Sequence, residues 1–174
     1  MTCGQRTSND DPVGETSHQA VTPEVFRGIF RQTVSTVAVV TAGATTPVGF
    51  TATSVTSASV DPPMVALGVS HTSRSWSTID ATEHLGVHFL RADQDACARR
   101  FAANGADKFG AGLGWHWGPH RIPVLDDCLS SLLCQIAGRL RVSESNTLIV
   151  ARVLAARIGS HAPPLTYRDG RYNG

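Results

Sequence analysis

Charge and long apolar runs are scarce in this sequence of 174 residues, and their scarcity excludes several functions. Only 17% of the residues are charged and the formal net charge is +1, so there is no basic surface for nucleic acid or for an anionic membrane. Residues 32–60 carry no charge, but their longest apolar run is "VAVV", set among Thr, Ser and Gly. A membrane span needs about 20 mainly apolar residues, so we expect a protein that binds neither nucleic acid nor membrane.

Paired cysteines and the familiar catalytic motifs are also missing. The cysteines at 3, 97, 128 and 134 form no C-x-x-C pair, and the N-terminal residues have no apolar secretory core. We therefore interpret them as free thiols of a cytoplasmic protein. No G-x-S-x-G or H-E-x-x-H occurs, and "GAGLG" at 110–114 is not the G-x-G-x-x-G of a dinucleotide-binding turn. A chain without its own acid–base set leaves the chemistry to a cofactor.

A metal site is not expected either. His116 and His120 stand four residues apart in "WHWGPH", a spacing that could align two ligands on a helix. Gly118 and Pro119 lie between them, and proline interrupts a helix. The segment therefore favours ordinary loop histidines.

The segments that remain predict a mainly β protein with short connecting helices. Residues 1–20 are polar and predict a disordered tail, and residues 21–174 predict one domain without a linker. Helices are predicted at 22–30, 73–82 and 93–104, with Thr22 as the first N-cap and Ser73 or Ser75 as the second. Strands are predicted at 36–42, 48–59, 63–70, 84–90, 129–142 and 147–159, with a loop at 105–127 and a closing hairpin at 163–172. Residues 36–59 are predicted to pair as a hairpin, and the strand-rich pattern indicates a barrel.

One predicted strand has an unusual composition. The segment "GFTATSVTSASVDPP", Gly49 to Pro63, is rich in short hydroxyl side chains, where a purely structural strand would use more β-branched and aromatic residues. Short hydroxyls let a flat ligand approach the backbone closely and offer it hydrogen bonds. The segment therefore predicts a ligand-binding strand.

The order of these segments resembles the flavin reductase family with the FMN-binding split-barrel fold, the small component of two-component flavin-dependent monooxygenases. The resemblance covers residues 24–172. It implies a mainly β, Greek-key-like split β-barrel with short connecting helices. It is carried by "FRGIFRQTVSTVAVVTA", "GFTATSVTSASVDPPMVALGV", "SRSWSTI", "HLGVHFL", "RIPVLDDCLSSLLCQI" and "PPLTYRDGRY".

The resemblance also implies a flavin site, for FMN or FAD. The flavin would lie along the hydroxyl-rich strand, with its phosphate at the start of the helix after "SRS". Lys108, the only lysine beside fourteen arginines, matches the family's lysine beside the phosphate, and a solvated surface charge is the alternative. The implied cofactor-binding residues are Gly49, Thr51, Ala52, Thr53, Ser54, Ser59, Val60, Asp61, Pro62, Ser73, Arg74, Ser75, Phe101 and Lys108.

The implied activity is NAD(P)H:flavin oxidoreduction, with NADH or NADPH as co-substrate, in a homodimer that supplies reduced flavin to a separate monooxygenase. The sequence departs from the family at Glu144, Ser145 and Asn146, where the family often has Gly-Asp-His with the histidine near the nicotinamide. Asn146 is thus the candidate catalytic position, and an ordinary hairpin turn is the alternative. His88 is a second departure, and we interpret it as facing the barrel interior.

Two other functions stay open at this stage. The first is an enzyme of the same fold that holds flavin tightly and acts directly on an organic, secondary-metabolite substrate. The missing histidine and the loop with Trp115 and Trp117, which could cover an apolar substrate, favour it. The second is a non-catalytic flavin-binding barrel.

Overall fold

The computed structural model describes residues 20–43, 45–159 and 161–173. Residues 1–19 of the predicted N-terminal tail lie outside these ranges. The tail and the domain boundary at residue 21 therefore stay predictions. None of the described helices is long and apolar enough to cross a bilayer.

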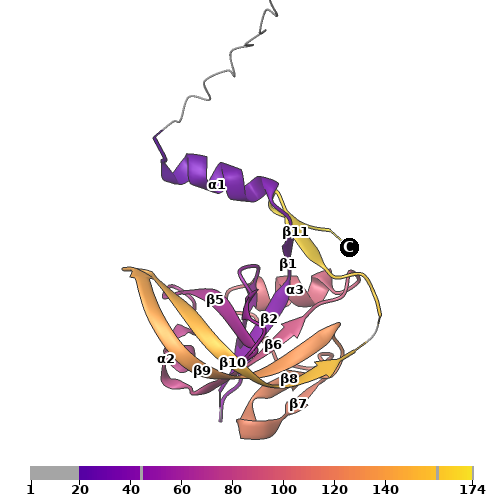
Figure 1. Ribbon diagram of the computed structural model, residues 1–174. Helices are drawn as coiled ribbons and strands as arrows, with labels where there is room; N and C mark the ends of the chain where they lie inside the picture. Colours follow the sequence, from indigo (N-terminus) through magenta and orange to yellow (C-terminus); the bar gives the residue numbers. More distant parts are fainter. Residues whose placement is uncertain (1–19, 44, 160, 174) are drawn as a thin grey trace, which may run out of the picture.

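A seven-stranded antiparallel sheet forms the body of the molecule (Figure 1). Its strand order is β3-β2-β6-β9-β10-β5-β4, and it is accompanied by one three-stranded sheet, β1-β11-β12, and one two-stranded sheet, β7-β8. The strands of the large sheet are β2 Ala38–Ala42, β3 Val48–Ala52, β4 Thr56–Ser59, β5 Met64–Ser70, β6 His84–Phe89, β9 Ser130–Ser143 and β10 Asn146–Ile158. The other elements are β1 Ser35–Thr36, β7 Trp115–Trp117, β8 Pro123–Leu125, β11 Thr166–Arg168, β12 Arg171–Asn173, the 3₁₀ helix η1 Pro119–Arg121, and the helices α1 Pro23–Gln32, α2 Trp76–Ala81 and α3 Asp95–Ala102. The predicted mainly β fold with short helices is confirmed.

The predicted single strand at 48–59 is wrong. Residues 48–52 pair with β2 as predicted, with Val40 opposite Phe50, but residues 56–59 pair with β5 at the other edge of the sheet. The Ser54 hydroxyl accepts a hydrogen bond from the Gly68 N–H of β5 at 3.1 Å. Because residues 53–55 alone connect the two edge strands, the sheet must curl until its edges meet, which makes it a barrel.

The barrel interior is filled by alternate residues of every long strand. Val40 of β2 and Val87 of β6 are opposite each other and point inward with Leu67, Cys134 and Ile149, all fully buried. A second core lies on the outer face of β2, where α3 packs. It contains Val37, Val39, Leu90, Ala98, Phe101, Leu125 and Leu165.

The prediction that His88 faces the barrel interior is wrong. His88 is opposite Val39 of β2, and successive residues of a strand point to opposite faces. Its neighbour Val87 points inward, so His88 points outward and is buried beneath the β7–β8 hairpin, where it contacts the Pro123 carbonyl.

Residues 105–127 are more ordered than the loop predicted for them. Trp115 pairs with Leu125 and Trp117 with Pro123, which makes a short hairpin. The Trp115 indole donates a hydrogen bond to the Phe109 carbonyl at 2.8 Å. Strands of three residues are too short to show a period in the sequence, so only the tertiary contacts reveal this hairpin.

Two local predictions are confirmed by their backbone geometry. Thr22 is the N-cap of α1, accepting a hydrogen bond from the Val25 N–H, and Pro23 follows it. The closing hairpin turns at Asp169 and Gly170, whose φ angles are 50° and 78°. Two positive φ angles in succession are the mark of a type I′ turn, which suits a two-residue hairpin.

Candidate functional site

Two neighbouring pockets lie where β3, α3 and the start of α2 meet. The first, here called the β3 pocket, has a volume of about 570 Å³, and the second, the Gly49 pocket, about 420 Å³. Both are lined by Arg74 and Lys108. The β3 pocket is also lined by Phe50, Thr51, Ala52, Thr53, Ser54, Gly68, Ser70, Thr72, Ser73, Phe101, Ala102, Asn104 and Asn146. Residues far apart in the sequence therefore line two pockets that share two cations.

The hydroxyl-rich strand forms one wall of the β3 pocket, but its hydroxyls have different tasks. Thr51 donates to the Ala98 carbonyl at 2.6 Å and so ties β3 to α3. Ser54 joins β3 to β5 through Gly68. Thr53 lies between them and is exposed. Two of the three hydroxyls thus hold neighbouring elements, and the third, that of Thr53, belongs to an exposed residue of the pocket lining.

The carbonyl oxygen of Gly49 accepts two side-chain hydrogen bonds in the Gly49 pocket. Lys108 Nζ donates to it at 2.9 Å and Ser75 Oγ at 3.0 Å. A Cβ at position 49 would lie 2.7 Å from Phe101 Cε1 and 3.0 Å from the Val40 carbonyl oxygen, so only glycine allows this close packing. Ser75 is the N-cap residue of α2, yet its hydroxyl makes this contact and gives no side-chain cap.

The electrostatics of the two pockets favour an anion. Burial and the neighbouring Arg74 both lower the pKa of Lys108, because two cations close together oppose each other's charge. Among the described residues that line the β3 pocket there is no carboxylate. Asp107 lines the Gly49 pocket, but its carboxylate lies against Gly110. An anion beside Arg74 and Lys108 would relieve the repulsion between them.

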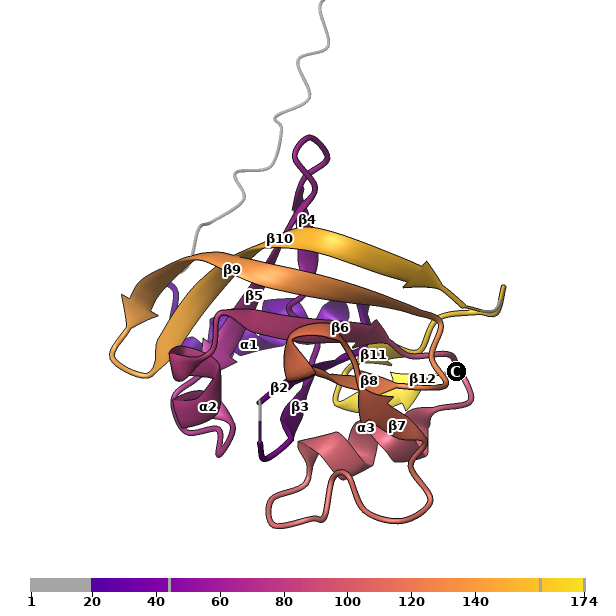
Figure 2. The same cartoon turned by 90° about the horizontal axis from the view of Figure 1, so that it is seen from below.

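Most of the predicted cofactor residues line these pockets. Those that do are Gly49, Thr51, Ala52, Thr53, Ser54, Ser73, Arg74, Ser75, Phe101 and Lys108. Ser59, Val60, Asp61 and Pro62 do not line either pocket. They lie at the tip of the β4–β5 hairpin, which projects on the opposite side of the molecule from α2 and α3, and Val60 is 87% exposed (Figure 2). The strand crossing at 53–55 separates them from the pocket within one chain.

Asn146 lines the β3 pocket together with the two cations. It begins β10 opposite Ser70 of β5, and its side-chain amide donates to the hydroxyls of Ser145 at 3.0 Å and Ser143 at 3.3 Å. The position is therefore both a turn residue and a pocket residue, so the two interpretations from the sequence are compatible.

His71 holds this turn from outside the pocket and was missed by sequence reasoning. Its ring Nδ1 lies 3.0 Å from the Glu144 carbonyl and its Nε2 lies 2.9 Å from Thr147 Oγ1. Because a carbonyl only accepts, Nδ1 carries the proton and Nε2 accepts from Thr147. The ring also stacks on Trp76, with centroids 4.2 Å apart. These partners meet only through the pairing of β5 with β10, which no local signal marks.

The two histidines considered as metal ligands have separate partners. His116 Nδ1 lies 2.5 Å from Asp126 Oδ1, and His120 stacks on His84 with centroids 3.9 Å apart. Across residues 20–43, 45–159 and 161–173, no group of three or more His, Cys, Asp and Glu side chains comes together.

Comparison with known proteins shows which family the chain is similar to. A family model described as "Flavin reductase like domain" matches residues 30–174. An NADH:riboflavin 5'-phosphate oxidoreductase of Streptomyces pristinaespiralis is 36% identical over 164 residues, which cover 92% of this chain and 90% of that protein. The reductase component of a 4-nitrophenol 4-monooxygenase/4-nitrocatechol 2-monooxygenase of Rhodococcus opacus is 32% identical over 164 residues, covering 94% and 86%. A crystal structure of a flavin reductase domain protein from Arthrobacter sp. FB24 is similar with a TM-score of 0.81 and 37% identity, covering 86% of this chain and 93% of that one.

Proposed function

The chain belongs to the flavin reductase family and is an oxidoreductase, and we propose that it reduces FMN or FAD with NADH in the β3 pocket and supplies the reduced flavin to a separate monooxygenase. The observation that carries the proposal is that the hydroxyl-rich strand and two cations, Arg74 and Lys108, line the same pocket. Among the described residues of that lining, no carboxylate neutralises these two cations. The flat ring of a flavin mononucleotide suits the hydroxyl-rich strand, and its phosphate suits the two cations.

Each part of the pocket has a task in this reaction. Arg74 and Lys108 would hold the phosphate, as paired cations hold anions through charge-assisted hydrogen bonds. Thr51, Ala52 and Thr53 would border the ring along β3. When bound, the flavin supplies the redox chemistry by accepting a hydride from the nicotinamide. The protein contributes the relative placement of the two reactants, which is worth many orders of magnitude in effective concentration.

Asn146 would place the nicotinamide. Its amide belongs to a residue of the pocket lining and donates to the hydroxyls of Ser143 and Ser145. An amide can both donate to and accept from the carboxamide of a nicotinamide. His71 keeps the turn in position through Glu144 and Thr147, and it is a positioning residue in this scheme.

Anaerobic reduction of flavin tests the proposed function. Adding NADH to the protein with FMN or FAD under argon should bleach the visible flavin absorption, and adding a partner monooxygenase with oxygen should restore it. Parallel titrations with NADPH and with riboflavin define the preferred pair. If the protein binds flavin but oxidises neither NADH nor NADPH, an enzyme that acts directly on an organic substrate becomes the better assignment. The cytoplasmic location stays a prediction.

Asn146→His is a prediction for the nicotinamide end of the pocket. We expect kcat/KM for NADH to rise by about fivefold, because an imidazole adds a flat face and a well-placed donor for the nicotinamide. Steady-state NADH oxidation measures the effect. The matched control is Asn104→His, which puts the same side chain elsewhere in the β3 pocket. If the wild-type enzyme already oxidises NADH rapidly and Asn146→His is no faster, Asn146 is only a turn residue. The reductase assignment would still hold in that case.

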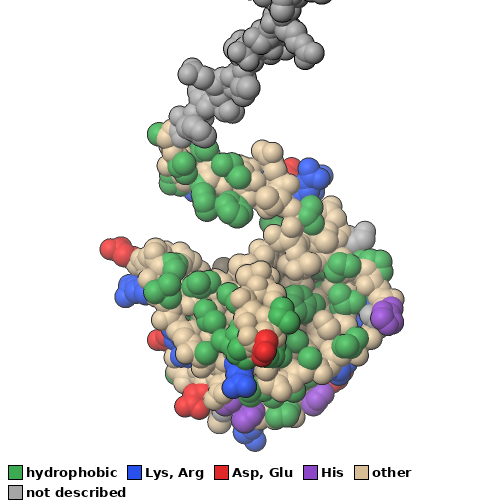
Figure 3. Space-filling view, viewed as in Figure 1, with side chains coloured by type: hydrophobic (Ala, Val, Ile, Leu, Met, Phe, Trp, Pro, Cys, Tyr) green, Lys and Arg blue, Asp and Glu red, His purple; other side chains and the backbone are tan. Residues whose placement is uncertain are grey.

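We also propose that the protein is a homodimer, with α1 at the interface. No residue of α1 is buried, and Phe26, Ile29 and Phe30 are 53%, 54% and 58% exposed. Figure 3 shows hydrophobic side chains on the side of α1 that faces the barrel across a gap, and Phe26 and Phe30 line this groove. An amphipathic helix is stable only when its apolar face is covered. The groove between α1 and the barrel, of about 460 Å³, is also lined by Thr53 and Ser54, so a second copy seated there would border the β3 pocket.

Phe30→Ser tests the dimer. We expect the dissociation constant of the dimer to rise about tenfold, because truncating one of the few side chains that dominate an interface costs more than about 1 kcal/mol. Light scattering after size-exclusion chromatography over a dilution series measures it. Gly28→Ser is the control, since a Cβ at position 28 has nothing within 4 Å. A wild-type protein that is monomeric at every concentration would contradict the homodimer.

A further inference from the structure

The β3 pocket and the Gly49 pocket are continuous along three segments of the chain. Residues 46–49 line the Gly49 pocket, and the next residues, 50–54, line the β3 pocket. In the same way the β3 pocket takes residues 101–104 and the Gly49 pocket residues 105–109, apart from Ala103, which lines neither. Arg74 and Lys108 line both pockets. The two pockets therefore lie end to end, and the two cations mark their junction.

The charged ends of both cations are placed at this junction. Lys108 Nζ is held by its hydrogen bond to the Gly49 carbonyl oxygen at 2.9 Å. Arg74 Nη1 lies 3.8 Å from the position that a Cβ would take on Gly105, a residue of the Gly49 pocket. Neither side chain forms an ion pair with a carboxylate that the structure describes. The junction therefore suits the anionic group of a ligand that extends into both pockets.

Beyond the junction the Gly49 pocket suits an uncharged group. Its described lining holds no lysine or arginine besides the two at the junction. Pro47, Val48 and Phe109 are half-buried there and give it apolar walls. The ring of Phe109 is itself supported by edge-on contact with the ring of Phe101. A flat, uncharged ring can pack against such walls, as a nucleic-acid base packs on an aromatic side chain.

The two flavin cofactors differ in what lies beyond the phosphate. FMN ends at a phosphate monoester, which carries a charge of about −1.5 to −2 near pH 7. FAD continues through a pyrophosphate with two charges into an adenosine. Two cations therefore suit either cofactor. The Gly49 pocket, of about 420 Å³, distinguishes them, because only FAD has a group to place there.

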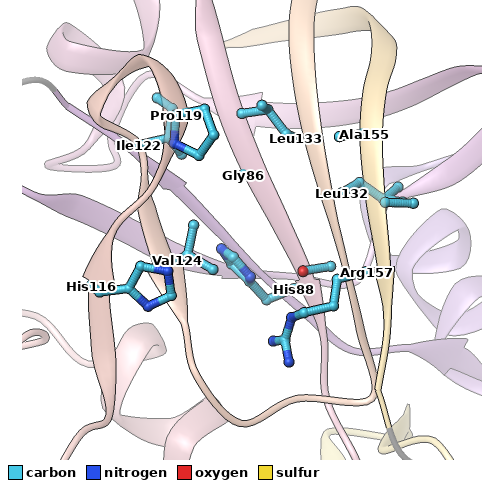
Figure 4. A pocket seen from close by; sticks show the side chains of 12 residues that line it. Gly86, His88, His116, Pro119, Ile122, Val124, Leu132, Leu133, Ala155 and Arg157 are labelled. Carbon is cyan, nitrogen blue, oxygen red and sulfur yellow. The ribbon is translucent and has the colours of Figure 1, made fainter.

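A third pocket, of about 220 Å³, does not extend this path. It lies under the β7–β8 hairpin and shares no lining residue with the other two pockets. Figure 4 shows Pro119, Ile122 and Val124 along one side of it and Leu132 and Ala155 along the other. A ligand that fills the β3 pocket therefore has the Gly49 pocket, and not this one, beyond its anionic group.

From this arrangement we propose that the Gly49 pocket holds the adenosine half of FAD, with the pyrophosphate beside Arg74 and Lys108, so that the protein binds FAD in preference to FMN. Adenine is the flat ring that the apolar walls receive. The inference rests on the proposed function, because it takes the flavin ring to lie in the β3 pocket. NADH also contains an adenosine, so the experiment has to separate the two.

Calorimetric titration of the full-length protein with FAD and with FMN tests the preference. We expect FAD to bind about tenfold more tightly, because its adenosine removes additional apolar surface from water. FMN binding as tight as FAD binding would overturn this inference and leave the proposed function standing. Binding of neither flavin would overturn both.

Ala106→Leu tests where the adenosine lies. Ala106 is exposed and lines the Gly49 pocket alone, so the larger side chain should fold normally and occupy space in that pocket. We expect the affinity for FAD to fall about fivefold, because filled space must be vacated or the ligand displaced. FMN ends at the junction and should lose less than about twofold, which also reports that the variant is folded.

Ala103→Leu is the matched control, since Ala103 is exposed on the same segment and lines neither pocket. It should bind both flavins as the wild-type protein does. Unchanged FAD affinity in Ala106→Leu, or equal losses for FAD and FMN, would contradict the inference. A higher KM for NADH with riboflavin as the acceptor, without a loss of FAD affinity, would assign the pocket to the adenosine of NADH and overturn it.

Discussion

Lys108→Ala is expected to weaken FMN binding by about 1–3 kcal/mol, roughly five- to 150-fold in the dissociation constant, the range for losing a charge-assisted hydrogen bond. Lys108 and Arg74 line the same two pockets, and Arg74 lowers the pKa of Lys108 in the free protein. A phosphate between them would replace repulsion with attraction. Quenching of flavin fluorescence during titration measures the affinity.

Riboflavin is the control for this prediction, because it has the same ring and no phosphate. Lys108 Nζ also donates to the Gly49 carbonyl, so the alanine variant loses a structural contact as well. Any loss of riboflavin affinity reports that contact, and the additional loss for FMN reports the phosphate. Lys108→Arg should keep most of the FMN affinity. Equal losses for FMN and riboflavin would mean that Lys108 shapes the pocket without binding phosphate.

His88→Gln is expected to remove a large part of the protein's sensitivity to acid. Burial lowers the pKa of His88 to about 4 in the folded protein, against about 6.5 in an unfolded chain. As the pH falls, this histidine therefore takes up a proton at a higher pH in the unfolded chain than in the folded protein. The stability that depends on a neutral His88 is fully present above pH 6.5 and is lost as the pH falls toward 4, by about 3 kcal/mol in all.

Urea unfolding at pH 7, 5.5 and 4, followed by tryptophan fluorescence, measures this effect. Glutamine keeps an amide that can reach Thr41 and cannot take up a proton in this range. The free energy of unfolding of His88→Gln should thus fall less steeply between pH 6.5 and 4 than that of the wild-type protein. His161→Gln, at an exposed histidine, is the control and should follow the wild type. Parallel curves for His88→Gln and wild type would contradict the prediction.

Much of the pocket could be predicted because the resemblance to flavin reductases is carried by ordered short segments, and the family match over residues 30–174 confirms it. Gly49, Thr51, Arg74 and Lys108 were all identified from their positions in those segments, and all line the β3 or Gly49 pocket. His71 and the outward orientation of His88 were not, because each depends on which strand lies alongside and which face is covered.

The sequence by itself determined the local features, since these depend on interactions between near neighbours. The Thr22 cap, the turn at Asp169 and Gly170, and the mainly β composition belong to this group. Only the tertiary structure decided where the hydroxyl-rich segment divides. Residues 50–60 contain no Gly, Pro, Asn or Asp, so no turn residue marks the break, and the closing of the barrel sends residues 48–52 and 56–59 to opposite edges of the sheet. That crossing leaves Thr51 to Ser54 in the pocket and carries Ser59 to Pro62 away from it.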